Sequence, residues 1–408
     1  MPTQIDSARQ AVSSACEDVR EATDDDHVDG VAPSLVARPT STEQVSDVLR
    51  AAAGHGLAVV PRGRGTKLSW GRPPTSVDLV VDVSAMDRVL EHAAGDLIVA
   101  TQAGTRLAGL QDAVGSGGQR LMLDETVPGA SIGGVLAANT SGPRRLVAGT
   151  PRDLLIGITV VRADGVVAKA GGRVVKNVAG YDLGKLMIGS FGTLGVITEA
   201  LFRLHPLPEV RRWVTVPVAD AVQAHELVQS AVHSQAVPGA IELDWPSGGE
   251  GSVTVLLEGR AEGVEGRTRT VQELLGGTSN VSDCEPSGWA SYPWSEGGTA
   301  LKLTFALSGL ADVVTAARES GVDLRGSAGT GVVYAAVPHP DGAEAAVTRL
   351  REVCTRHRGS LVVVDAPPEV KKAVDVWGPV PALDLMRRVK DRFDTDHRLA
   401  PGRFVGGI

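Results

Sequence analysis

The sequence predicts an α+β protein with two lobes, and three observations support this prediction. Residues 129–195 contain 14 of the 49 glycines in a chain of 408 residues, and these glycines separate short runs of β-branched residues. Residues 45–53 place apolar side chains at helical spacing shortly before an apolar strand. From residue 210 onward the glycine-rich loops become rare, and strands alternate with helices over short connections, as in an antiparallel sheet covered by helices.

The first lobe follows a polar leader at residues 1–28. Thr40 and Glu43 can form a capping box for a helix that Gly54 and Gly56 end. This helix leads into the strand that precedes the first glycine-rich loop. The elements predicted here are strands at 57–60, 79–83 and 97–104, a helix at 105–114, and a tight hairpin that turns at Asp164-Gly165.

The second lobe has its own order of strands and helices. We place the boundary between the lobes at residues 205–208, where two prolines interrupt strand pairing. The predicted domains are therefore 29–207 and 208–408. The predicted strands are 213–218, 240–244, 252–258, 300–307, 331–337 and 360–365, and the predicted helices are 224–232, 262–275, 309–319, 341–357 and 382–393.

Two glycine-rich segments are suited to hold a phosphate-bearing ligand. In residues 129–195, glycines allow positive φ angles and the close approach of main-chain N–H groups to an anion. A glycine-rich all-β scaffold is the alternative interpretation of that segment. In the run Pro61-Arg62-Gly63-Arg64-Gly65-Thr66, glycines, amides and guanidinium charge converge. This run is not the Rossmann fingerprint, because it lacks the third glycine.

Several motifs of the first lobe occur together with these two segments. They are Pro128-Gly129-Ala130-Ser131-Ile132-Gly133-Gly134, Asn139-Thr140-Ser141-Gly142, Arg152-Asp153, Lys176 with Gly180-Tyr181-Asp182-Leu183, and Gly189-Ser190-Phe191-Gly192-Thr193-Leu194-Gly195-Val196-Ile197-Thr198. Over residues 29–205 the set resembles the FAD-binding fold of the vanillyl-alcohol oxidase and p-cresol methylhydroxylase (PCMH) superfamily. Within it, residues 61–71 and 175–182 most resemble the FAD-binding subunits of bacterial glycolate oxidases. The resemblance implies a PCMH-type FAD-binding domain at 29–207 and a cap domain at 208–408 whose C-terminal segment returns to the first domain.

The resemblance also implies which residues contact FAD. The first loop and the 128–134 loop are expected to hold the diphosphate through main-chain N–H groups, and Ile197 to run beside the flavin or adenine. Asn139 and Ser141 are either contacts of the ring system or turn-forming residues. The candidate cofactor-binding residues are Pro61, Arg62, Gly63, Arg64, Gly65, Thr66, Pro128, Gly129, Ser131, Gly133, Gly134, Asn139, Ser141 and Ile197. Thr66 stands where some relatives attach the flavin through a histidine, so we expect non-covalent FAD.

The second lobe lacks the catalytic groups that the resemblance would lead one to expect. In catalytic relatives a glycine-rich motif supplies histidines near the flavin, whereas the corresponding residues 326–334 contain Ser327, Thr330 and Tyr334. These side chains are poor bases and poor metal ligands near neutral pH. The sequence therefore assigns no catalytic residue. Arg403 either reaches the flavin or a substrate carboxylate or lies exposed to solvent, and the roles of Arg403 and Tyr334 stay open.

The resemblance thus implies an oxidoreductase subunit in glycolate catabolism, working in a hetero-oligomer with a catalytic FAD subunit and an iron–sulfur subunit. The three cysteines, Cys16, Cys284 and Cys354, are too far apart in the sequence to suggest a cluster or a metal site of this chain's own. A free-standing FAD-dependent oxidase or dehydrogenase of an unknown hydroxy substrate is one alternative. A non-catalytic assembly partner that FAD stabilises is the other.

Composition excludes several other classes of protein. The net charge of −8 argues against a nucleic-acid partner. The N-terminal residues have no sustained apolar core of a signal peptide, and no apolar run approaches the length of a membrane-spanning helix. We therefore expect a cytoplasmic protein that contacts a membrane only through its partners.

Overall fold

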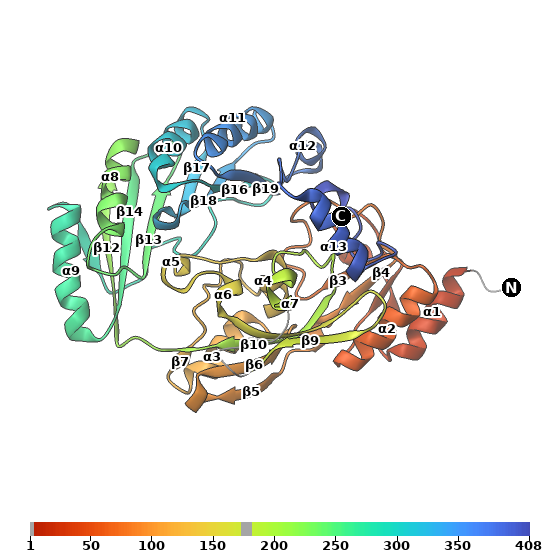
Figure 1. The fold of residues 1–408 in the computed structure, drawn as a ribbon. Helices are drawn as coiled ribbons and strands as arrows, with labels where there is room; N and C mark the ends of the chain where they lie inside the picture. The colour runs from red at the N-terminus through yellow and green to blue at the C-terminus, as the bar shows by residue number, and fades with distance from the viewer. Residues whose placement is uncertain (1–3, 173–181) are drawn as a thin grey trace.

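A four-stranded and a five-stranded sheet carry the first lobe, in the lower half of Figure 1. The computed structural model describes residues 4–172 and 182–408. The four-stranded sheet has the order β1 (Val19–Glu21), β2 (Leu35–Ala37), β4 (Leu79–Asp82), β3 (Val59–Arg62). The five-stranded sheet has the order β5 (Val89–Ala93), β6 (Ile98–Gln102), β10 (Val196–Arg203), β8 (Leu155–Val161), β9 (Val167–Gly171). As predicted, β8 and β9 form an antiparallel hairpin that turns at Asp164-Gly165, where Gly165 has a φ of 79°.

The parallel pairing of β3 with β4 positions the first glycine-rich loop. Both strands are short apolar runs, and parallel strands of this kind are buried on both faces. Arg62 lies beside Asp82 at the carboxyl ends of the two strands. The loop therefore begins at the edge where the sheet ends.

Helices cover the sheets of the first lobe. The structure corrects the predicted start of α2, because Ser41 rather than Thr40 is the N-cap and its side chain accepts a hydrogen bond from the amide of Gln44. The amide of Thr40 instead donates to the Gln44 side chain. The helices are α1 (Gln4–Ala15), α2 (Thr42–Gly54), α3 (Leu107–Gly115), α4 (Ile132–Ala138), α5 (Arg145–Ala148), α6 (Pro151–Leu154) and α7 (Leu183–Met187).

An eight-stranded antiparallel sheet forms the second lobe, as the sequence predicts. Its order is β15 (Asn280–Ser282), β12 (Val210–Val218), β14 (Gly251–Gly259), β13 (Ala240–Trp245), β17 (Asp323–Ser327), β18 (Val332–Val337), β16 (Thr299–Thr304), β19 (Ser360–Asp365). Strand β17 was not predicted, because only Leu324 in it is a large apolar residue. Its pairing with β13 and β18 creates it. The helices are α8 (Ala221–Val232), α9 (Ala261–Leu275), α10 (Leu310–Glu319), α11 (Ala343–Arg356), α12 (Pro368–Ala373) and α13 (Leu383–Phe393).

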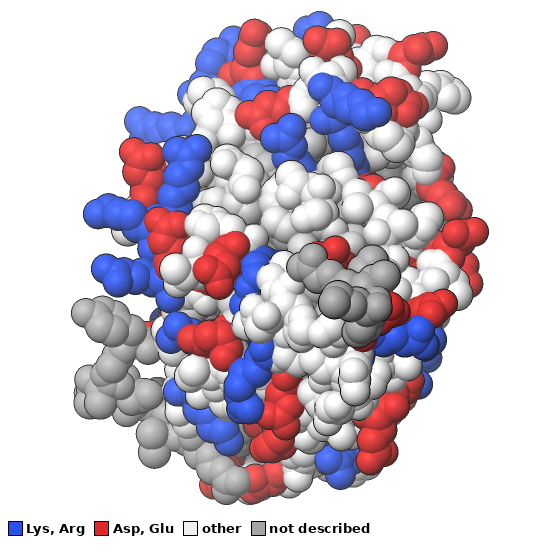
Figure 2. All heavy atoms as spheres, turned by 90° about the vertical axis from the view of Figure 1, so that its right-hand side faces the viewer, with Lys and Arg blue, Asp and Glu red and all other residues white. Residues whose placement is uncertain are grey.

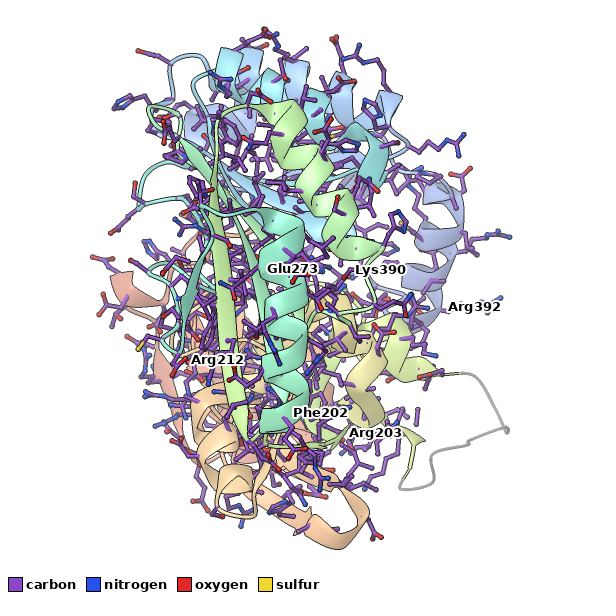
Figure 3. The ribbon with its side chains drawn as sticks, turned by 90° about the vertical axis from the view of Figure 1, so that its left-hand side faces the viewer. Phe202, Arg203, Arg212, Glu273, Lys390 and Arg392 are labelled. Atoms are coloured by element: carbon purple, nitrogen blue, oxygen red, sulfur yellow. The ribbon has the colours of Figure 1, made fainter. Side chains whose placement is uncertain are left out.

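Helices α8 to α11 cover one face of this sheet, and the other face turns toward α4 and α5 of the first lobe (Figure 1). Figure 3 shows α9 lying along the sheet near Arg212 of β12. Val255, Val333 and Leu350 belong to the buried core of this lobe, whereas Val48 and Phe202 belong to that of the first lobe. The helices thus shield one face, and the opposite face is left to build contacts between the lobes.

The chain joins the two lobes at several places. Pro206 forms the two-residue strand β11 (His205–Pro206), which pairs with β7 (Gln119–Arg120). The expectation that the prolines interrupt strand pairing is therefore wrong at Pro206, because pairing on an edge tolerates a residue without an N–H donor. Across the lobes, the Arg120 guanidinium donates to the Glu258 carboxylate at 2.8 Å.

The C-terminal residues extend the sheet of the first lobe. The amide of Val59 donates to the Arg398 carbonyl at 2.7 Å, and the amide of Ala400 donates to the Val59 carbonyl at 2.8 Å. Lys390 of α13 is fully buried and donates to the carbonyls of Thr193 and Leu399. Residues 390–400 are therefore fixed against the strand that leads into the glycine-rich loop.

The surface carries mixed charge. Figure 2 shows basic and acidic side chains next to each other over one face, without a broad region of a single sign. Within the described residues, no helix combines the length and apolarity needed to cross a membrane. The described residues on the face shown in Figure 2 thus form no extended basic groove for a nucleic acid.

Candidate cofactor site

Two loops that are far apart in the sequence meet at Gly63 and Ser131. A Cβ atom built on Gly63 would overlap the Ser131 hydroxyl oxygen and lie 3.1 Å from the Ser131 Cβ. Ser131 cannot easily move, because its side chain caps α4 by accepting a hydrogen bond from the Gly134 amide. Gly65 has a φ of 75°, a conformation that glycine adopts without strain. The structure thus brings the two loops side by side, as the expectation that both contact one diphosphate requires.

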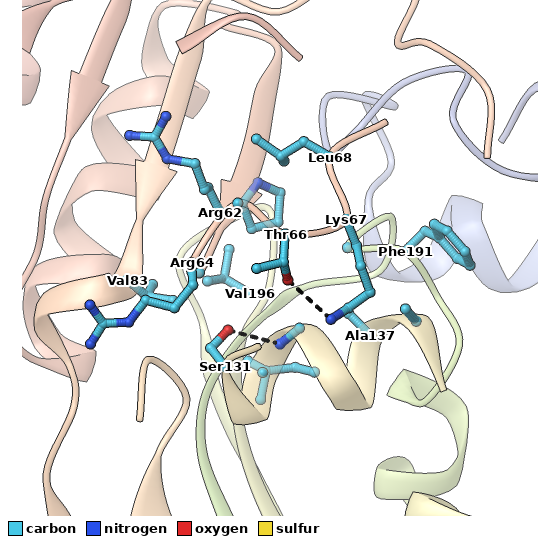
Figure 4. Close-up of a pocket in the computed structure, with 18 of the residues that line it drawn as sticks. Arg62, Arg64, Thr66, Lys67, Leu68, Val83, Ser131, Ala137, Phe191 and Val196 are labelled. Atoms are coloured by element: carbon cyan, nitrogen blue, oxygen red, sulfur yellow. Dashed lines mark hydrogen bonds between the residues drawn. The ribbon is translucent and has the colours of Figure 1, made fainter. Parts of the chain in front are cut away.

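These loops line a cavity, shown in Figure 4. It encloses about 740 Å³ of empty space, part of which is open to solvent. Its lining combines the 61–68 loop, one side of α4, the 191–197 segment and the C-terminal Arg403. The lining residues are Pro61, Arg62, Gly63, Arg64, Gly65, Thr66, Lys67, Leu68, Val83, Ser131, Gly133, Gly134, Ala137, Ala138, Phe191, Gly192, Gly195, Val196, Ile197 and Arg403.

The main-chain amides of residues 64–67 belong to the loop that lines this cavity. Among the described residues, no protein acceptor takes a hydrogen bond from the amides of residues 64–67. Thr66 is exposed and the other three residues are half-buried, so these amides can bond to water or to a ligand in the cavity. A row of consecutive amides in a curled loop favours an anion such as a phosphate. The residues present therefore fit a diphosphate-bearing cofactor.

The second loop behaves differently from the sequence expectation. The amide of Gly129 donates to the Glu125 carboxylate, that of Gly133 to the Ala103 carbonyl, and that of Gly134 to the Ser131 hydroxyl. Each of these three amides thus has a protein acceptor in this structure, and the expectation that they grip the diphosphate stays a prediction. The glycines instead allow close packing: a Cβ on Gly133 would lie 3.0 Å from the Ala103 Cβ.

The two arginines of the first loop stabilise it rather than facing the cavity with their charges. Arg62 donates to Asp26 and to Asp82, each at 2.8 Å, and Arg64 donates to Asp87 and to the Gly104 carbonyl. Figure 4 shows both guanidinium groups pointing away from α4. The expectation that their charge neutralises phosphate is therefore corrected, because carboxylates from neighbouring segments already neutralise it.

Two further cations line the cavity: Lys67, which was not among the candidate residues, and Arg403, whose role the sequence left open. Lys67 follows the loop, and its ammonium group donates to the Thr66 hydroxyl at 3.3 Å. Burial lowers the pKa of Lys67 to about 8, which is the response expected of a desolvated ammonium group. A phosphate beside it would restore the charged form. The adjacency of Lys67 to the glycine-rich run was the only sequence signal for it.

Arg403 is the second of these cations, and the interpretation of it as solvent-exposed is wrong. Its side chain is buried, and Nη2 donates to the carbonyls of Leu68 at 2.6 Å and Trp70 at 2.8 Å. Burial lowers the pKa of Arg403 to about 10. Arg403 thus fixes the far end of the first loop from the C-terminal segment.

The remaining predicted residues occupy three different places. Ile197 lines the cavity, whereas Pro128 and Gly129 do not. Asn139 has a left-handed backbone, with φ 49° and ψ 48°, at the C-terminal end of α4 and lines a neighbouring cavity. Ser141 lines a third cavity. The matched residues from Lys176 to Tyr181 lie outside the described part of the chain.

The neighbouring cavity continues the first one toward the second lobe. The two share Ala138 and Phe191, and aromatic side chains from both lobes line the extension. Tyr292 stacks on Trp294 with ring centroids 4.3 Å apart and packs at 4.5 Å against Tyr334. A polar loop followed by an aromatic cavity suits a ligand that has an anionic part and a flat apolar part.

Comparison with known proteins relates this fold and the first lobe to FAD-binding proteins. Residues 33–171, about a third of the chain, match the family described as "FAD binding domain". The solved structure of p-cresol methylhydroxylase with substrate bound superposes with a TM-score of 0.77 at 16% identity, covering 98% of this chain and 96% of that one. At this identity the likeness shows the fold. The predicted fold class and cofactor, FAD, are thus confirmed.

The chain is related in sequence to FAD-linked oxidoreductases, including two glycolate oxidase subunits. It is 35% identical over 217 residues to glycolate oxidase subunit GlcD of Bacillus subtilis, which covers 53% of this chain and 46% of that protein. It is 33% identical over 221 residues to glycolate oxidase subunit GlcE of Escherichia coli, which covers 54% of this chain and 60% of that protein. The chain thus spans about half the length of these curated relatives.

Proposed function

We propose that the chain is the FAD-binding subunit of a glycolate (2-hydroxy acid) oxidase or dehydrogenase complex. In this complex it works beside a catalytic FAD subunit and an iron–sulfur subunit and takes part in flavin-mediated electron transfer. The single observation that carries the proposal is the cavity where Gly63 packs against Ser131 and the amides of residues 64–67 have no protein acceptor in the described structure. The sequence relationship to two glycolate oxidase subunits supports the choice of complex.

The chain's own residues bind and orient the cofactor in this proposal. The 64–67 amides and Lys67 hold the diphosphate, and Val196 and Ile197 contact the ring system from β10. Bound FAD supplies the ability to accept a hydride or electrons. Asp26, Asp82 and Arg403 hold the first loop in place from three different parts of the chain.

The division of labour between subunits rests on residues 326–334. Ser327 and Tyr334 are buried where catalytic relatives carry histidines, by the resemblance described above. Neither side chain is a base near neutral pH. A separate catalytic subunit that retains those histidines would supply the missing base, and an iron–sulfur subunit would pass the electrons onward.

Acid precipitation of the purified, flavin-loaded chain tests the cofactor part of the proposal. Thr66 stands at the position where a histidine forms the covalent link in some relatives, and residues 62–68 contain neither histidine nor cysteine. We therefore expect the yellow colour to leave with the supernatant. A purified chain that is colourless and shows no affinity for added FAD contradicts the proposal.

Stopped-flow mixing with glycolate and with D-lactate tests the remaining part. Under the proposal the flavin bleaches only in the assembled complex. Bleaching by the isolated chain supports the free-standing oxidase or dehydrogenase, and no bleaching in either setting supports the assembly partner that FAD stabilises. Counting flavin and iron after co-purification from the native host gives the composition of the complex.

A further inference from the structure

A third cavity lies between the lobes, next to the aromatic cavity. Helix α5 and the preceding loop form its side in the first lobe, and β13, β17 and β18 form its side in the second. It shares Tyr292 and Tyr334 with the aromatic cavity, which in turn shares Ala138 and Phe191 with the cofactor cavity. The three cavities therefore lie next to one another, from the first glycine-rich loop to the interface between the lobes.

Polar side chains without partners converge on this third cavity. In the described part of the chain, Ser141 Oγ, Arg145 Nη1, Glu242 Oε1 and Ser327 Oγ are buried and have no hydrogen-bond partner. All four residues line the same cavity. Buried polar atoms are nearly always paired, and unpaired atoms on four residues that line one cavity favour a polar ligand there, although Ser327 also lies close enough to Glu242 to lower its pKa. Two of the atoms come from each lobe, so that molecule would bridge the lobes.

The neighbouring charged groups are already committed to other partners. Arg325 donates to both carboxylate oxygens of Asp244, at 3.0 and 3.2 Å. Asp124 accepts from the Arg144 amide and side chain. Of the two described arginines that line this cavity, Arg145 is thus the one with a buried nitrogen that has no acceptor, and an anion satisfies it best.

Glu242 complements Arg145 on the opposite wall. Burial is the main cause that raises the pKa of Glu242 well above its usual range, and the nearby Asp124 adds to the effect. The protonated form of a carboxyl group, which a raised pKa favours, has one O–H donor and one carbonyl acceptor. It can therefore hydrogen-bond to a hydroxyl group or to a carboxylate without electrostatic repulsion.

We propose that this cavity binds a small carboxylate. Its negative charge pairs with Arg145, and Glu242 and the two serine hydroxyls hydrogen-bond to its hydroxyl group or second oxygen. The four unpartnered atoms and their placement on both lobes carry the inference. The interpretation of this ligand as the hydroxy acid that meets the flavin rests on the proposed function. The existence of the anion site does not.

Isothermal titration calorimetry of the full, FAD-loaded chain with glycolate tests the inference. Glycolamide, in which a neutral amide replaces the carboxylate, serves as the comparison ligand. We expect glycolate to bind and glycolamide to bind at least about tenfold more weakly. Arg145→Ala should lower the affinity for glycolate by about tenfold or more, because a buried anion then loses its charged partner. Arg152→Ala is the matched control, because Arg152 is exposed and lies further along the chain, on α6. It should leave the affinity unchanged.

A second variant keeps the test valid if Arg145→Ala unfolds the protein. Glu242→Gln preserves shape and neutral hydrogen bonding and should retain glycolate affinity within about threefold, whereas Glu242→Leu should lower it by about tenfold or more. Thermal unfolding and flavin content establish that each variant is folded. If the wild type binds none of glycolate, oxalate, acetate and D-lactate, the inference is overturned, and ordered water fills the cavity instead. Equal binding by wild type and folded Arg145→Ala overturns it too.

The two proposals fail in different ways. A yellow chain that binds none of the four acids retains the proposed cofactor function and excludes the anion site. A colourless chain that binds glycolate through Arg145 retains the anion site and excludes the cofactor function.

Discussion

The close contact between Gly63 and Ser131 makes Gly63→Ala the sharpest test of the cofactor site. The new Cβ would overlap the Ser131 hydroxyl oxygen and lie 3.1 Å from the Ser131 Cβ. Either the first loop moves away from α4, or the Ser131 side chain rotates and α4 loses its cap. Overpacking of this kind costs about 1–3 kcal/mol. Loss of a serine cap costs about 1 kcal/mol.

Both responses disturb the loop that carries the free amides. Because a factor of ten in affinity corresponds to about 1.4 kcal/mol, a loss of about 1–3 kcal/mol predicts FAD binding weakened by roughly 5- to 150-fold. Titration of the apoprotein with FAD, followed by quenching of flavin fluorescence, measures this change. Thermal unfolding of the apoprotein in parallel shows how much of the cost falls on the fold itself.

Gly109→Ala provides the control for this substitution. Gly109 lies in α3, and a Cβ there would meet no atom within 4 Å. Alanine in a helix interior is favoured over glycine by about 0.5–1 kcal/mol, so this variant should bind FAD normally and unfold no earlier than the wild type. The double variant Gly63→Ala, Ser131→Gly should recover most of the lost affinity. Wild-type affinity in Gly63→Ala would refute the account of the two loops.

Two further predictions concern titrating groups near the same loop. The Arg20 guanidinium, with the Thr23 amide and Arg62, holds the pKa of Asp26 well below its usual range despite burial, so the unfolded chain binds more protons than the folded one in acid. The stabilisation is therefore present above the unfolded pKa of about 3.9 and is lost as the pH falls below it. Between about pH 7 and pH 3, the melting temperature of Asp26→Asn should fall less than that of the wild type. Equal falls in melting temperature would contradict this. Burial lowers the pKa of Lys67 to about 8 and a diphosphate favours its charged form, so FAD affinity should fall as the pH rises through about 8. Lys67→Met should remove that pH dependence in a fluorescence titration, and an unchanged pH profile would count against a phosphate contact.

Local patterns in the sequence were enough for most of the fold. The apolar runs at 79–82 and 251–259 form strands, and the period of 3.6 residues in 42–54 forms a helix, because neighbouring residues decide these patterns. The turn at Asp164-Gly165 was predictable for the same reason, since a tight hairpin requires residues that tolerate positive φ. Strand β17 was missed because its pairing partners, rather than its own composition, create it.

The site was predictable only in part. The glycines of the first loop and their closeness to Ser131 followed from the glycine pattern together with the family resemblance. The orientation of Arg62 and Arg64 did not, because their partners Asp26, Asp82 and Asp87 come from other segments. Whether a guanidinium group pairs with a phosphate or with a carboxylate depends on which of them lies nearer in space. The sequence does not specify these distances.

The sequence by itself thus determined the α+β class and the two glycine-rich loops, because these depend on local backbone requirements that specific residues meet, and its resemblance to a known family implied the cofactor. Only the tertiary structure decided which amides lack a protein acceptor, that Lys67 and Arg403 line the cavity, and that Arg145 and Glu242 line one cavity between the lobes. Burial and hydrogen-bond pairing are properties of atoms brought together from distant parts of the chain. They come into existence only when the chain has folded.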